Sequence, residues 1–475
     1  MRSSAVLPQL LLVSSSVFTA VNARAVFAHY LVGNVFDQDA QTDIENAMSM
    51  GLDAFALNVA DPSASYVAPA LASLFNHAES SGFKLFLSMD LDAKGGGPLS
   101  DYGYIIDTYA GGGAWFAGDN GKPLVSTFSA AAYQASDIQA FRDAYDVYFV
   151  PDFDNTDGYY TASDGWWSYW GGLVDGLFSW ESSWPQVDAT NDGDVSLDVT
   201  VLNGAVAHSK SYMIGLSLLQ YKDAYGTNIY RHGEQTLPIR MANILAMNPA
   251  PLYVEIITWN DGPEGHYIGN LWTEQNSDVQ PDTYASQRGA AHTGIQPLLT
   301  EFINSFRNLQ TSFLPSANPV GAIWYKTILQ STTCPDDDLG GFYSPPNGAS
   351  VGLDNINWAV VLPSDGASYT IQFVSNGGAV GGTITGKPGF QHGAVPLSVN
   401  AQYMKIVNSA GVTEYSTGLG RCVSSECFDD IYNYNPQVLG LEQGDHATVG
   451  CWEMTQQASA SSDGATTGPF YPSGI

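Results

Sequence analysis

Short apolar runs alternate with amphipathic stretches over residues 26–310. Most of the runs end in a polar or turn-forming residue, and such runs are typical of buried parallel strands. We expect eight strands, at 26–32, 54–58, 84–90, 124–128, 147–152, 176–180, 212–216 and 253–259. Apolar residues at three- and four-residue steps predict helices between them, at 41–48, 66–75, 237–245 and 295–306. Eight strands that alternate with helices predict an α/β fold, a (β/α)8 TIM-type barrel.

The pattern changes after about residue 330 to short alternating runs that Gly, Pro, Asn and Asp clusters separate. Strands are expected there at 357–362, 368–374, 382–385 and 404–407. Regular short strands with such turns predict an all-β, sandwich-like domain. We therefore expect a catalytic barrel over 26–328, an accessory β-sandwich over 329–456 and a flexible Ser/Gly-rich tail over 457–475.

The first 25 residues have the pattern of a secretory signal peptide. Arg2 precedes an apolar stretch over residues 6–20, and Ala23-Arg-Ala25 forms an A-x-A cleavage site. Cleavage after Ala20 is the alternative. No later stretch approaches the roughly 18 apolar residues that a membrane span needs. We therefore expect a secreted protein, located outside the cell or in the cell wall.

Export makes the four cysteines candidates for disulfides, because the extracellular environment is oxidising. Four cysteines allow three pairings. We favour a short Cys422–Cys427 loop together with Cys334–Cys451, which would join the two ends of the C-terminal domain. Zinc binding is the rival interpretation, but no histidine stands at ligand spacing beside these cysteines. No metal is therefore expected.

The charge of the chain excludes several classes of partner. Acidic residues number 47 and basic residues 16, giving a formal net charge of -31. Nucleic acid and anionic membranes would repel such a chain. Aromatic residues make up 12% of the sequence, which suits stacking on sugar rings and equally suits large cores. No cofactor motif occurs, and we expect a monomer.

Polar residues follow several of the predicted strands directly. In a parallel barrel the loops after the strands converge on one face, where reactive groups gather. Each such residue alone is typical of a turn or a helix cap, but five around one rim indicate a site. They are Asn58, Asp90, Asp152, Glu181 and Asp261.

The strongest local signal is the turn Asn260-Asp-Gly-Pro-Glu-Gly265 after the last strand. Gly and Pro break regular structure there and leave Asp261 and Glu264 three residues apart. Three extended residues span about 10 Å at most, so the two carboxylates can lie anywhere from contact to the roughly 6.5–9.5 Å of an inverting glycosidase. An acidic turn or a calcium-binding loop is the alternative interpretation.

Several segments resemble those of fungal glycoside hydrolase family 71, the α-1,3-glucanases or mutanases. The matching segments are 27–34, 85–90, 180–185, 220–223, 228–238 and 258–270. The resemblance implies a (β/α)8 catalytic domain, a β-rich C-terminal domain, hydrolysis with inversion, and acidic residues corresponding to Asp90, Asp261 and Glu264. The substrate that the resemblance implies is α-1,3-glucan, the polysaccharide that occurs as mutan and in the fungal cell wall.

Inversion needs an acid that protonates the leaving oxygen and a base that activates water. We assign both roles to Asp261 and Glu264 and favour Glu264 as the acid, with the reverse order left open. Asp90 would stabilise charge at the anomeric carbon or adjust the pKa of a partner. The expected substrate-binding residues are His29, Tyr30, Asn58, Asp152, Trp180, Glu181, Trp184, Arg231, His232, Glu234, Trp259, Asn260 and His266. For the aromatic residues, packing at the barrel mouth is the alternative, and for the charged loop 231–234 it is an ion-pair network.

Two further motifs carry no expected function. Gly348-Ala-Ser-Val-Gly352 matches a nucleophile-elbow pattern but leads into a strand instead of a helix. Asp188–Gly193 resembles the start of a calcium loop, but Val199 stands at its twelfth position, where Glu is required.

Two other functions remain as alternatives: a barrel glycosidase for another glucan, and a non-catalytic glucan-binding protein. We also expect exposed aromatics such as Tyr432 and Tyr434 to attach the C-terminal domain to insoluble substrate. Its removal should then reduce activity on insoluble glucan more than on soluble oligosaccharide.

Overall fold

The computed structural model describes residues 24–129, 133–286, 289–427, 430–447 and 450–452. The expected tail at 457–475 lies outside these residues, as does the expected signal peptide apart from Arg24 and Ala25. The first strand begins at Ala25. None of the helices in the described part of the chain is long and apolar enough to cross a membrane.

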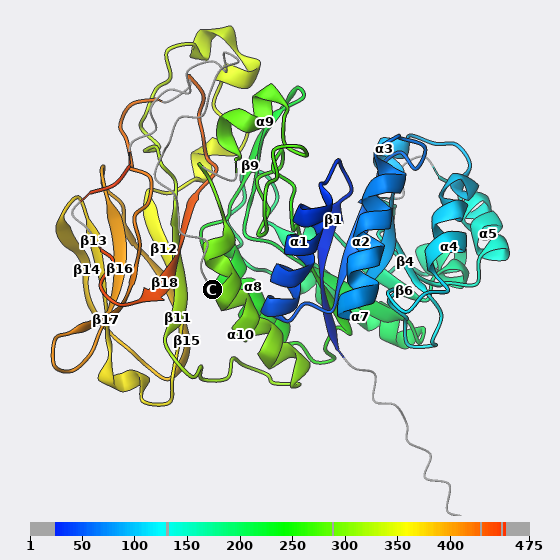
Figure 1. Cartoon of the computed structure of the whole chain (residues 1–475), viewed down its shortest axis with the longest axis horizontal. Coiled ribbons are helices and arrows are strands. Elements are labelled where there is room, and N and C mark those ends of the chain that lie inside the picture. Colours follow the sequence, from blue (N-terminus) through cyan, green and yellow to red (C-terminus); the bar gives the residue numbers. More distant parts are fainter. Residues whose placement is uncertain (1–23, 130–132, 287–288, 428–429, 448–449, 453–475) are drawn as a thin grey trace, which may run out of the picture.

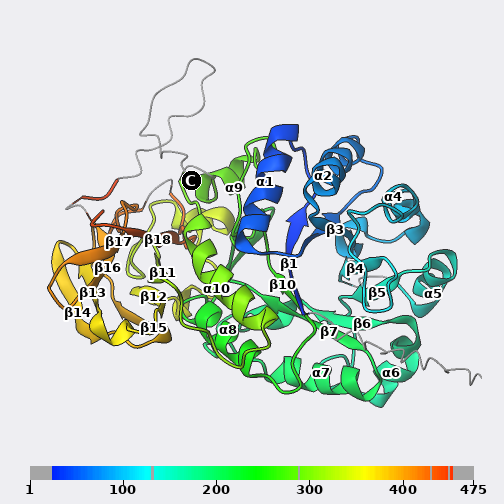
Figure 2. The same ribbon diagram turned by 60° about the horizontal axis from the view of Figure 1, so that its bottom comes forward.

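Eight parallel strands form a nearly closed barrel in the N-terminal two thirds of the chain (Figure 2). All eight expected strands are confirmed within a few residues at their ends. They are β1 (Ala25–Leu31), β2 (Ala54–Val59), β3 (Lys84–Asp90), β4 (Leu124–Phe128), β5 (Tyr148–Pro151), β6 (Gly176–Ser179), β7 (Ser211–Leu216) and β10 (Tyr253–Ile256). The sheet runs β5-β4-β3-β2-β1-β10-β7-β6, and a parallel bridge between Asp152 and Phe178 joins its two edges.

Helices surround this barrel and cover its outer face (Figure 2). The four helices expected from apolar periodicity correspond to α1 (Asp37–Met50), α2 (Val67–Ser81), α8 (Thr236–Ala246) and α10 (Gln296–Arg307). The remaining ones are α3 (Leu91–Lys94), α4 (Gly103–Tyr109), α5 (Ala135–Ala144), α6 (Asp164–Trp170), α7 (Ser196–Ala207) and α9 (Val279–Tyr284). In α10 the residues at three- and four-residue steps, Leu299, Phe302 and Phe306 among them, are buried.

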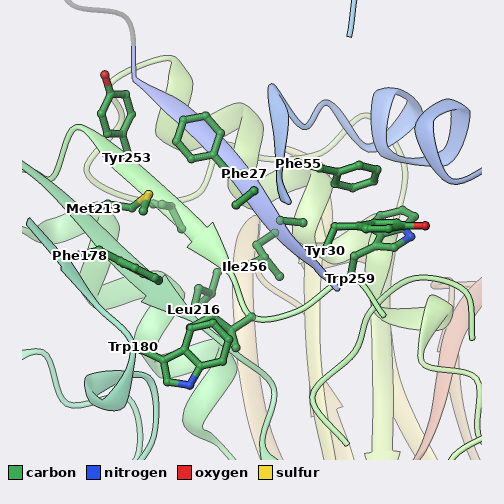
Figure 3. Close-up of a cluster of buried hydrophobic side chains, with 14 of the residues drawn as sticks. Phe27, Tyr30, Phe55, Phe178, Trp180, Met213, Leu216, Tyr253, Ile256 and Trp259 are labelled. Atoms are coloured by element: carbon green, nitrogen blue, oxygen red, sulfur yellow. The ribbon is translucent and has the colours of Figure 1, made fainter. Parts of the chain in front are cut away.

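Alternation along the strands divides the barrel core into two layers (Figure 3). Phe27 packs inside against Phe86 and Tyr253, with ring centroids 5.0 and 5.3 Å away. His29, two residues further along β1, lies on the same inner side. Tyr30 points the other way, toward Phe55 and the surrounding helices. The barrel interior is therefore apolar at its base and becomes polar toward the carboxyl ends of the strands.

A β-hairpin interrupts the connection between β7 and α8. Its strands are β8 (Gln220–Ala224) and β9 (Thr227–Arg231), paired antiparallel. Tyr225 and Gly226 form the two-residue turn, both with positive φ, as in type I′ hairpins. From the sequence, only a loop was expected here.

The C-terminal domain is all-β, and its eight strands run antiparallel (Figure 1). They are β11 (Val320–Tyr325), β12 (Asn355–Leu362), β13 (Thr370–Ser375), β14 (Gly378–Thr385), β15 (Gly389–Pro396), β16 (Gln402–Val407), β17 (Thr413–Thr417) and β18 (Gln437–Gln443). The four expected strands correspond to β12, β13, β14 and β16, while β11, β15, β17 and β18 were not expected, and β11 lies in the range expected for the barrel. The strands form a single barrel-like sheet instead of a sandwich, because β18 pairs with both β17 and β11. Alternation predicts strands and faces, but not which strands become neighbours.

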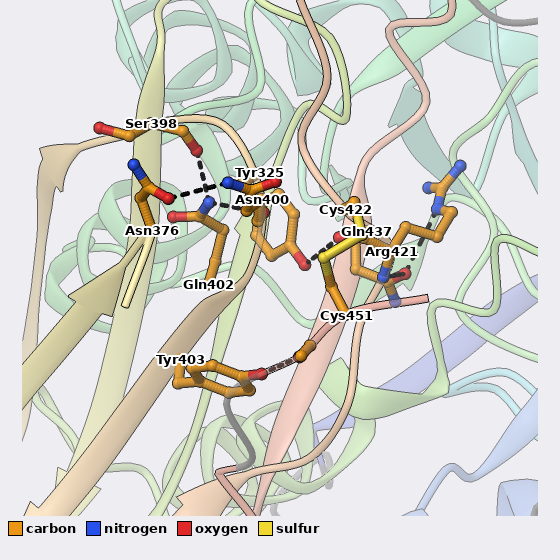
Figure 4. The surroundings of a disulfide bond; sticks show 11 residues. Tyr325, Asn376, Ser398, Asn400, Gln402, Tyr403, Arg421, Cys422, Gln437 and Cys451 are labelled. Carbon is orange, nitrogen blue, oxygen red and sulfur yellow. Dashed lines mark hydrogen bonds between the residues drawn. A yellow bond between two sulfur atoms is a disulfide. The ribbon is translucent and has the colours of Figure 1, made fainter. Parts of the chain in front are cut away.

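The predicted disulfides Cys422–Cys427 and Cys334–Cys451 are wrong. The structure pairs Cys334 with Cys427 and Cys422 with Cys451. A hydrogen bond from the Cys422 amide to the carbonyl of Trp452, 3.0 Å long, brings residue 451 beside residue 422. Figure 4 shows this disulfide next to Tyr403 and Arg421. Short spacing in the sequence misled the prediction, because backbone pairing decides which cysteines meet.

The two tyrosines expected to be exposed for attachment are buried. Tyr432 and Tyr434 are 6% and 3% exposed. Both contact the barrel: the Tyr432 carbonyl accepts a hydrogen bond from Tyr221, and the Tyr434 ring packs on Tyr230. They therefore belong to the interface between the two domains and cannot serve as an exposed platform for glucan.

Candidate active site

The turn after β10 carries both expected catalytic carboxylates and is fixed by its own hydrogen bonds. The amide of Asp261 donates to Oγ1 of Thr258 at 2.9 Å, and the amide of Glu264 donates to Oδ1 of Asp261 at 3.0 Å. Gly265 adopts a φ of +71°, and a Cβ there would lie 2.7 Å from the carbonyl oxygen of Tyr221. The turn therefore lies directly against the β8–β9 hairpin and needs glycine at that position.

Asp261, Glu264 and His266 form a compact cluster. One ligand-type atom from each lies within 4.8 Å of the others. Nε2 of His266 is 3.1 Å from Oε2 of Glu264 and 4.0 Å from Oδ2 of Asp261. The two carboxylates therefore lie on one side of the site, closer together than the roughly 6.5–9.5 Å of inverting pairs.

Two residues of β8 bind the Glu264 carboxylate as well. Gln220 donates from Nε2 to Oε2 at 2.6 Å, and Nζ of Lys222 lies 3.0 Å from Oε1. Both residues lie in the segment 220–223 that resembles the family, but neither was expected in the site. The signal that could have indicated their role is the spacing of Gln220 and Lys222, because residues two apart in a strand point to the same side.

The environment separates the pKa values of the two carboxyl groups. Burial raises the pKa of Asp261 to about 6, with nearby Glu264 adding to the rise and His266 opposing it. Burial also acts upward on Glu264, but the hydrogen bond and charge of His266 and the ammonium of Lys222 lower its pKa well below the usual range. In mildly acidic solution Glu264 is therefore ionised while Asp261 retains its proton, which favours Asp261 as acid and Glu264 as base. This order is the reverse of the one that the sequence favoured.

A second buried pair lies inside the barrel mouth. Nδ1 of His29 is 2.7 Å from Oε1 of Glu255, and both side chains are almost fully buried. His29 meets Trp180 edge-on, with ring centroids 4.8 Å apart. Glu255 was missed as a site residue, although a single acid within the apolar strand Tyr253–Ile256 is a visible signal.

Asp90 lies at the start of α3, where its carboxylate accepts the Ala93 amide at 2.9 Å. Burial raises the pKa of Asp90, and hydrogen bonds from Ala93 and Asn58 and the charge of His29 oppose the rise. The structure therefore brings Asp90, Asn58 and His29 together, as their positions at the strand ends suggested.

Three further expected residues form a chain of contacts that begins at the His266 ring. Trp184 stacks on it with centroids 5.4 Å apart and planes 22° apart. The Arg231 guanidinium lies 5.6 Å from the Trp184 ring and 2.7 Å from Glu181. Nε and Nη1 of Arg231 are buried and have no hydrogen-bond partner among the described residues. Glu181 and Trp184, the two residues that the Arg231 guanidinium contacts, help to line a small cavity.

The other expected residues lie apart from this cluster and have structural contacts. Tyr30 donates to Asp43 at 3.1 Å, and Trp259 packs on Phe55. Asn260 bonds both backbone groups of Leu31.

Asp152 accepts the amides of Ser129 and Asp154. His232 contacts Asp192 at 2.5 Å and Glu234 at 3.2 Å, while Glu234 accepts the amide of Leu353 from the C-terminal domain. Asp192, His232 and Glu234 thus form an ion-pair network within the barrel, and Glu234 links it to the C-terminal domain by a hydrogen bond.

The fold and this site define a class of protein: a barrel enzyme with a paired-carboxylate site, the arrangement of glycoside hydrolases. Residues 22–449 match the profile of glycosyl hydrolase family 71, and the chain belongs to this family.

Curated relatives of similar length match most of the chain. A mutanase of Penicillium rubens is 29% identical over 429 residues, covering 89% of this chain and 90% of the relative. A glucan endo-1,3-alpha-glucosidase of Schizosaccharomyces pombe is 26% identical, covering 90% and 97%. An ascus wall endo-1,3-alpha-glucanase of the same yeast is 26% identical, covering 81% and 89%.

Among solved structures, a GH99 endo-alpha-mannosidase from Bacteroides thetaiotaomicron aligns with a TM-score of 0.47 and 13% identity. The alignment covers 60% of this chain and 98% of that one.

Proposed function

We propose that this protein hydrolyses the α-1,3-glucosidic bonds of α-1,3-glucan, such as mutan or the fungal cell wall polymer. Membership of family 71 and the names of three relatives support this substrate. The observation that carries the proposal is the Asp261–Glu264 pair, whose pKa values are moved in opposite directions. A glucan-binding protein without activity would not need such a pair.

In the proposed reaction Asp261 protonates the glycosidic oxygen and Glu264 takes a proton from the attacking water. His29 lies on β1, the neighbour of β10, and Asp90 ends β3 two strands further on. Both would bind the sugar near its anomeric carbon, while Arg231 would bind hydroxyl groups of the chain. Inversion, as the family resemblance implies, requires the two carboxyl groups to move apart when glucan enters. Asp261 is the group we expect to move, because Glu264 is held by His266, Gln220 and Lys222.

The signal-like N-terminus, the two disulfides and the ascus wall relative support an extracellular or cell-wall location. We propose that the enzyme acts there as a monomer and without a cofactor.

The decisive assay measures reducing sugar released from insoluble α-1,3-glucan, with β-1,3-glucan, starch and dextran in parallel. We expect release from α-1,3-glucan alone. Release from another glucan instead would favour a barrel glycosidase of different specificity. Binding to glucan without release would favour the non-catalytic alternative.

A further inference from the structure

The β8–β9 hairpin lies between the candidate base and the C-terminal domain. Alternate residues of β8 point to opposite sides, so Gln220 and Lys222 bind Glu264 while Tyr221 points away from it. The Tyr221 hydroxyl donates to the carbonyl of Tyr432 at 2.9 Å. Its ring stacks near that of Tyr434, with centroids 6.3 Å apart and planes 28° apart. The strand that holds Glu264 therefore rests on the C-terminal domain.

The contacting segment is Ile431-Tyr-Asn-Tyr-Asn435, which we name the 431–435 strap, and all five of its residues are buried. At its end, Nδ2 of Asn435 donates to the hydroxyl of Tyr267 at 3.0 Å and to the carbonyl of Tyr284 at 2.8 Å. The Tyr284 hydroxyl in turn donates to the carbonyl of Pro263 at 2.6 Å. Pro263 lies between the two candidate catalytic carboxylates, so the strap reaches their turn from a second side.

Further contacts hold the hairpin and the strap in place. Strand β9 pairs with residue 347: the Tyr230 amide donates to the Asn347 carbonyl at 2.8 Å, and the Asn347 amide donates to Asn228 at 3.0 Å. Figure 1 shows β9 and α9 in the upper part of the molecule, next to the segment that follows β11. The amide of Cys334 donates to the Tyr432 hydroxyl, and Cys334 is disulfide-bonded to Cys427 just before the strap.

We propose that the 431–435 strap is a positioning element of the catalytic centre, acting through Tyr221 on the hairpin and through Tyr284 on the turn. The inference rests on the proposed role of Glu264. It goes further, because it makes the C-terminal domain necessary for the chemical step itself. Small displacements of reacting groups reduce turnover strongly, so loss of the strap would reduce kcat. Soluble oligosaccharides and insoluble glucan would be affected alike, unlike the result expected for an attachment domain.

The test uses the full-length protein and two variants, Tyr221→Phe and Asn435→Ala. Each removes hydrogen bonds to the strap and leaves every group that binds Glu264 in place. With a soluble α-1,3-linked oligosaccharide, we expect kcat to fall roughly three- to tenfold, the value of about one buried hydrogen bond, with little change in KM. The matched control is Tyr325→Phe, which loses a buried 2.9 Å bond to the backbone carbonyl of Arg421 in the same domain but keeps the bond from the Arg421 guanidinium to the Asn435 carbonyl of the strap.

A second readout separates positioning from general destabilisation. The ionisable groups that face Glu264 are Asp261 and His266 from the turn, Lys222 from β8 and Tyr284 from α9. A displaced hairpin would weaken the Lys222 contact, raise the pKa of Glu264 and move the acidic limb of the kcat/KM profile to higher pH. Tyr325→Phe should leave that limb unchanged.

Hydrogen exchange of segments 220–231 and 258–268 needs no substrate and therefore tests the strap separately from the proposed function. We expect faster exchange in both segments for Tyr221→Phe and Asn435→Ala, and unchanged exchange for Tyr325→Phe. Wild-type kinetics and exchange in Tyr221→Phe would overturn the inference, as would an equal loss of kcat in Tyr325→Phe. Failure of the wild type to cleave α-1,3-glucan would instead overturn the proposed function.

Discussion

The amide of Glu264 donates a hydrogen bond to the carboxylate of Asp261, so each of the two candidate catalytic residues helps to fix the other. The same turn therefore sets both the backbone geometry and the electrostatics of the pair. Because His266 and Lys222 bind only the Glu264 side of this pair closely, the two carboxyl groups titrate far apart. Interacting groups of this kind titrate as a pair, and in the proposed mechanism the pair would provide an acid and a base at the same pH.

Replacing either carboxylate by its amide should stop turnover without unfolding the protein. For Asp261→Asn and Glu264→Gln we expect kcat to fall at least about 10²–10⁴-fold, because an amide neither donates nor accepts the required proton. Binding of glucan should remain. The measurement is kcat on α-1,3-glucan oligosaccharides, with Asp143→Asn on the exposed face of α5 as the control that keeps wild-type activity.

The two amide variants should be distinguishable by rescue. A substrate whose leaving group needs no protonation should restore much of the rate of Asp261→Asn, the acid variant. Azide should restore the rate of Glu264→Gln by replacing activated water. Rescue in the opposite sense would show that Glu264 is the acid, and normal hydrolysis by either variant would remove that residue from the mechanism.

The pH dependence should follow the two separated pKa values. In the proposed mechanism activity requires Asp261 protonated and Glu264 ionised, so kcat/KM should fall above about pH 6, where Asp261 loses its proton. Lys222 lowers the pKa of both carboxyl groups, and Lys222→Met should therefore move both limbs of the profile to higher pH. Profiles that coincide for the wild type and Lys222→Met would contradict this electrostatic role.

The sequence predicted the barrel well because local pattern determines it. Each apolar run, such as residues 84–90, is buried on both faces and specifies its own strand, and polar residues after the strands mark the mouth. The turn 260–265 was visible for the same reason. Gly and Pro follow an apolar strand there and separate two acidic side chains, Asp261 and Glu264.

What the sequence did not predict depends on contacts between distant segments. Lys222 binds Glu264 only because the hairpin folds over the turn, and Tyr434 is buried only because the domains meet there. The order of the acid and the base also depends on those neighbours, since the separation of three residues is the same in either order. The cysteine pairing failed for a related reason, because backbone pairing between 421 and 452 decides it.

Peptide mapping without reduction should find Cys334 linked to Cys427 and Cys422 linked to Cys451. Removing the second link in Cys422→Ser/Cys451→Ser should lower the stability by about 2–4 kcal/mol, because the unfolded chain regains the freedom of a loop of 29 residues. Thermal unfolding measures the loss. Activity below the unfolding transition should remain, since this disulfide lies away from the hairpin and the turn. A Cys422–Cys427 peptide in the map would contradict the pairing.

The configuration of the first product tests whether the carboxyl groups move apart. Hydrolysis with inversion of an α-1,3-glucosidic bond gives a β-configured reducing end, which then mutarotates slowly enough for NMR to detect it. Inversion requires room for water between the base and the sugar, about 6.5–9.5 Å between the carboxyl groups, whereas one oxygen of each now lies within 4.8 Å of the other. We expect the β-anomer first, with Asp261 turned away from Glu264 in the glucan complex. An α-anomer as first product would show that the pair works at its present short separation and that the reaction retains configuration.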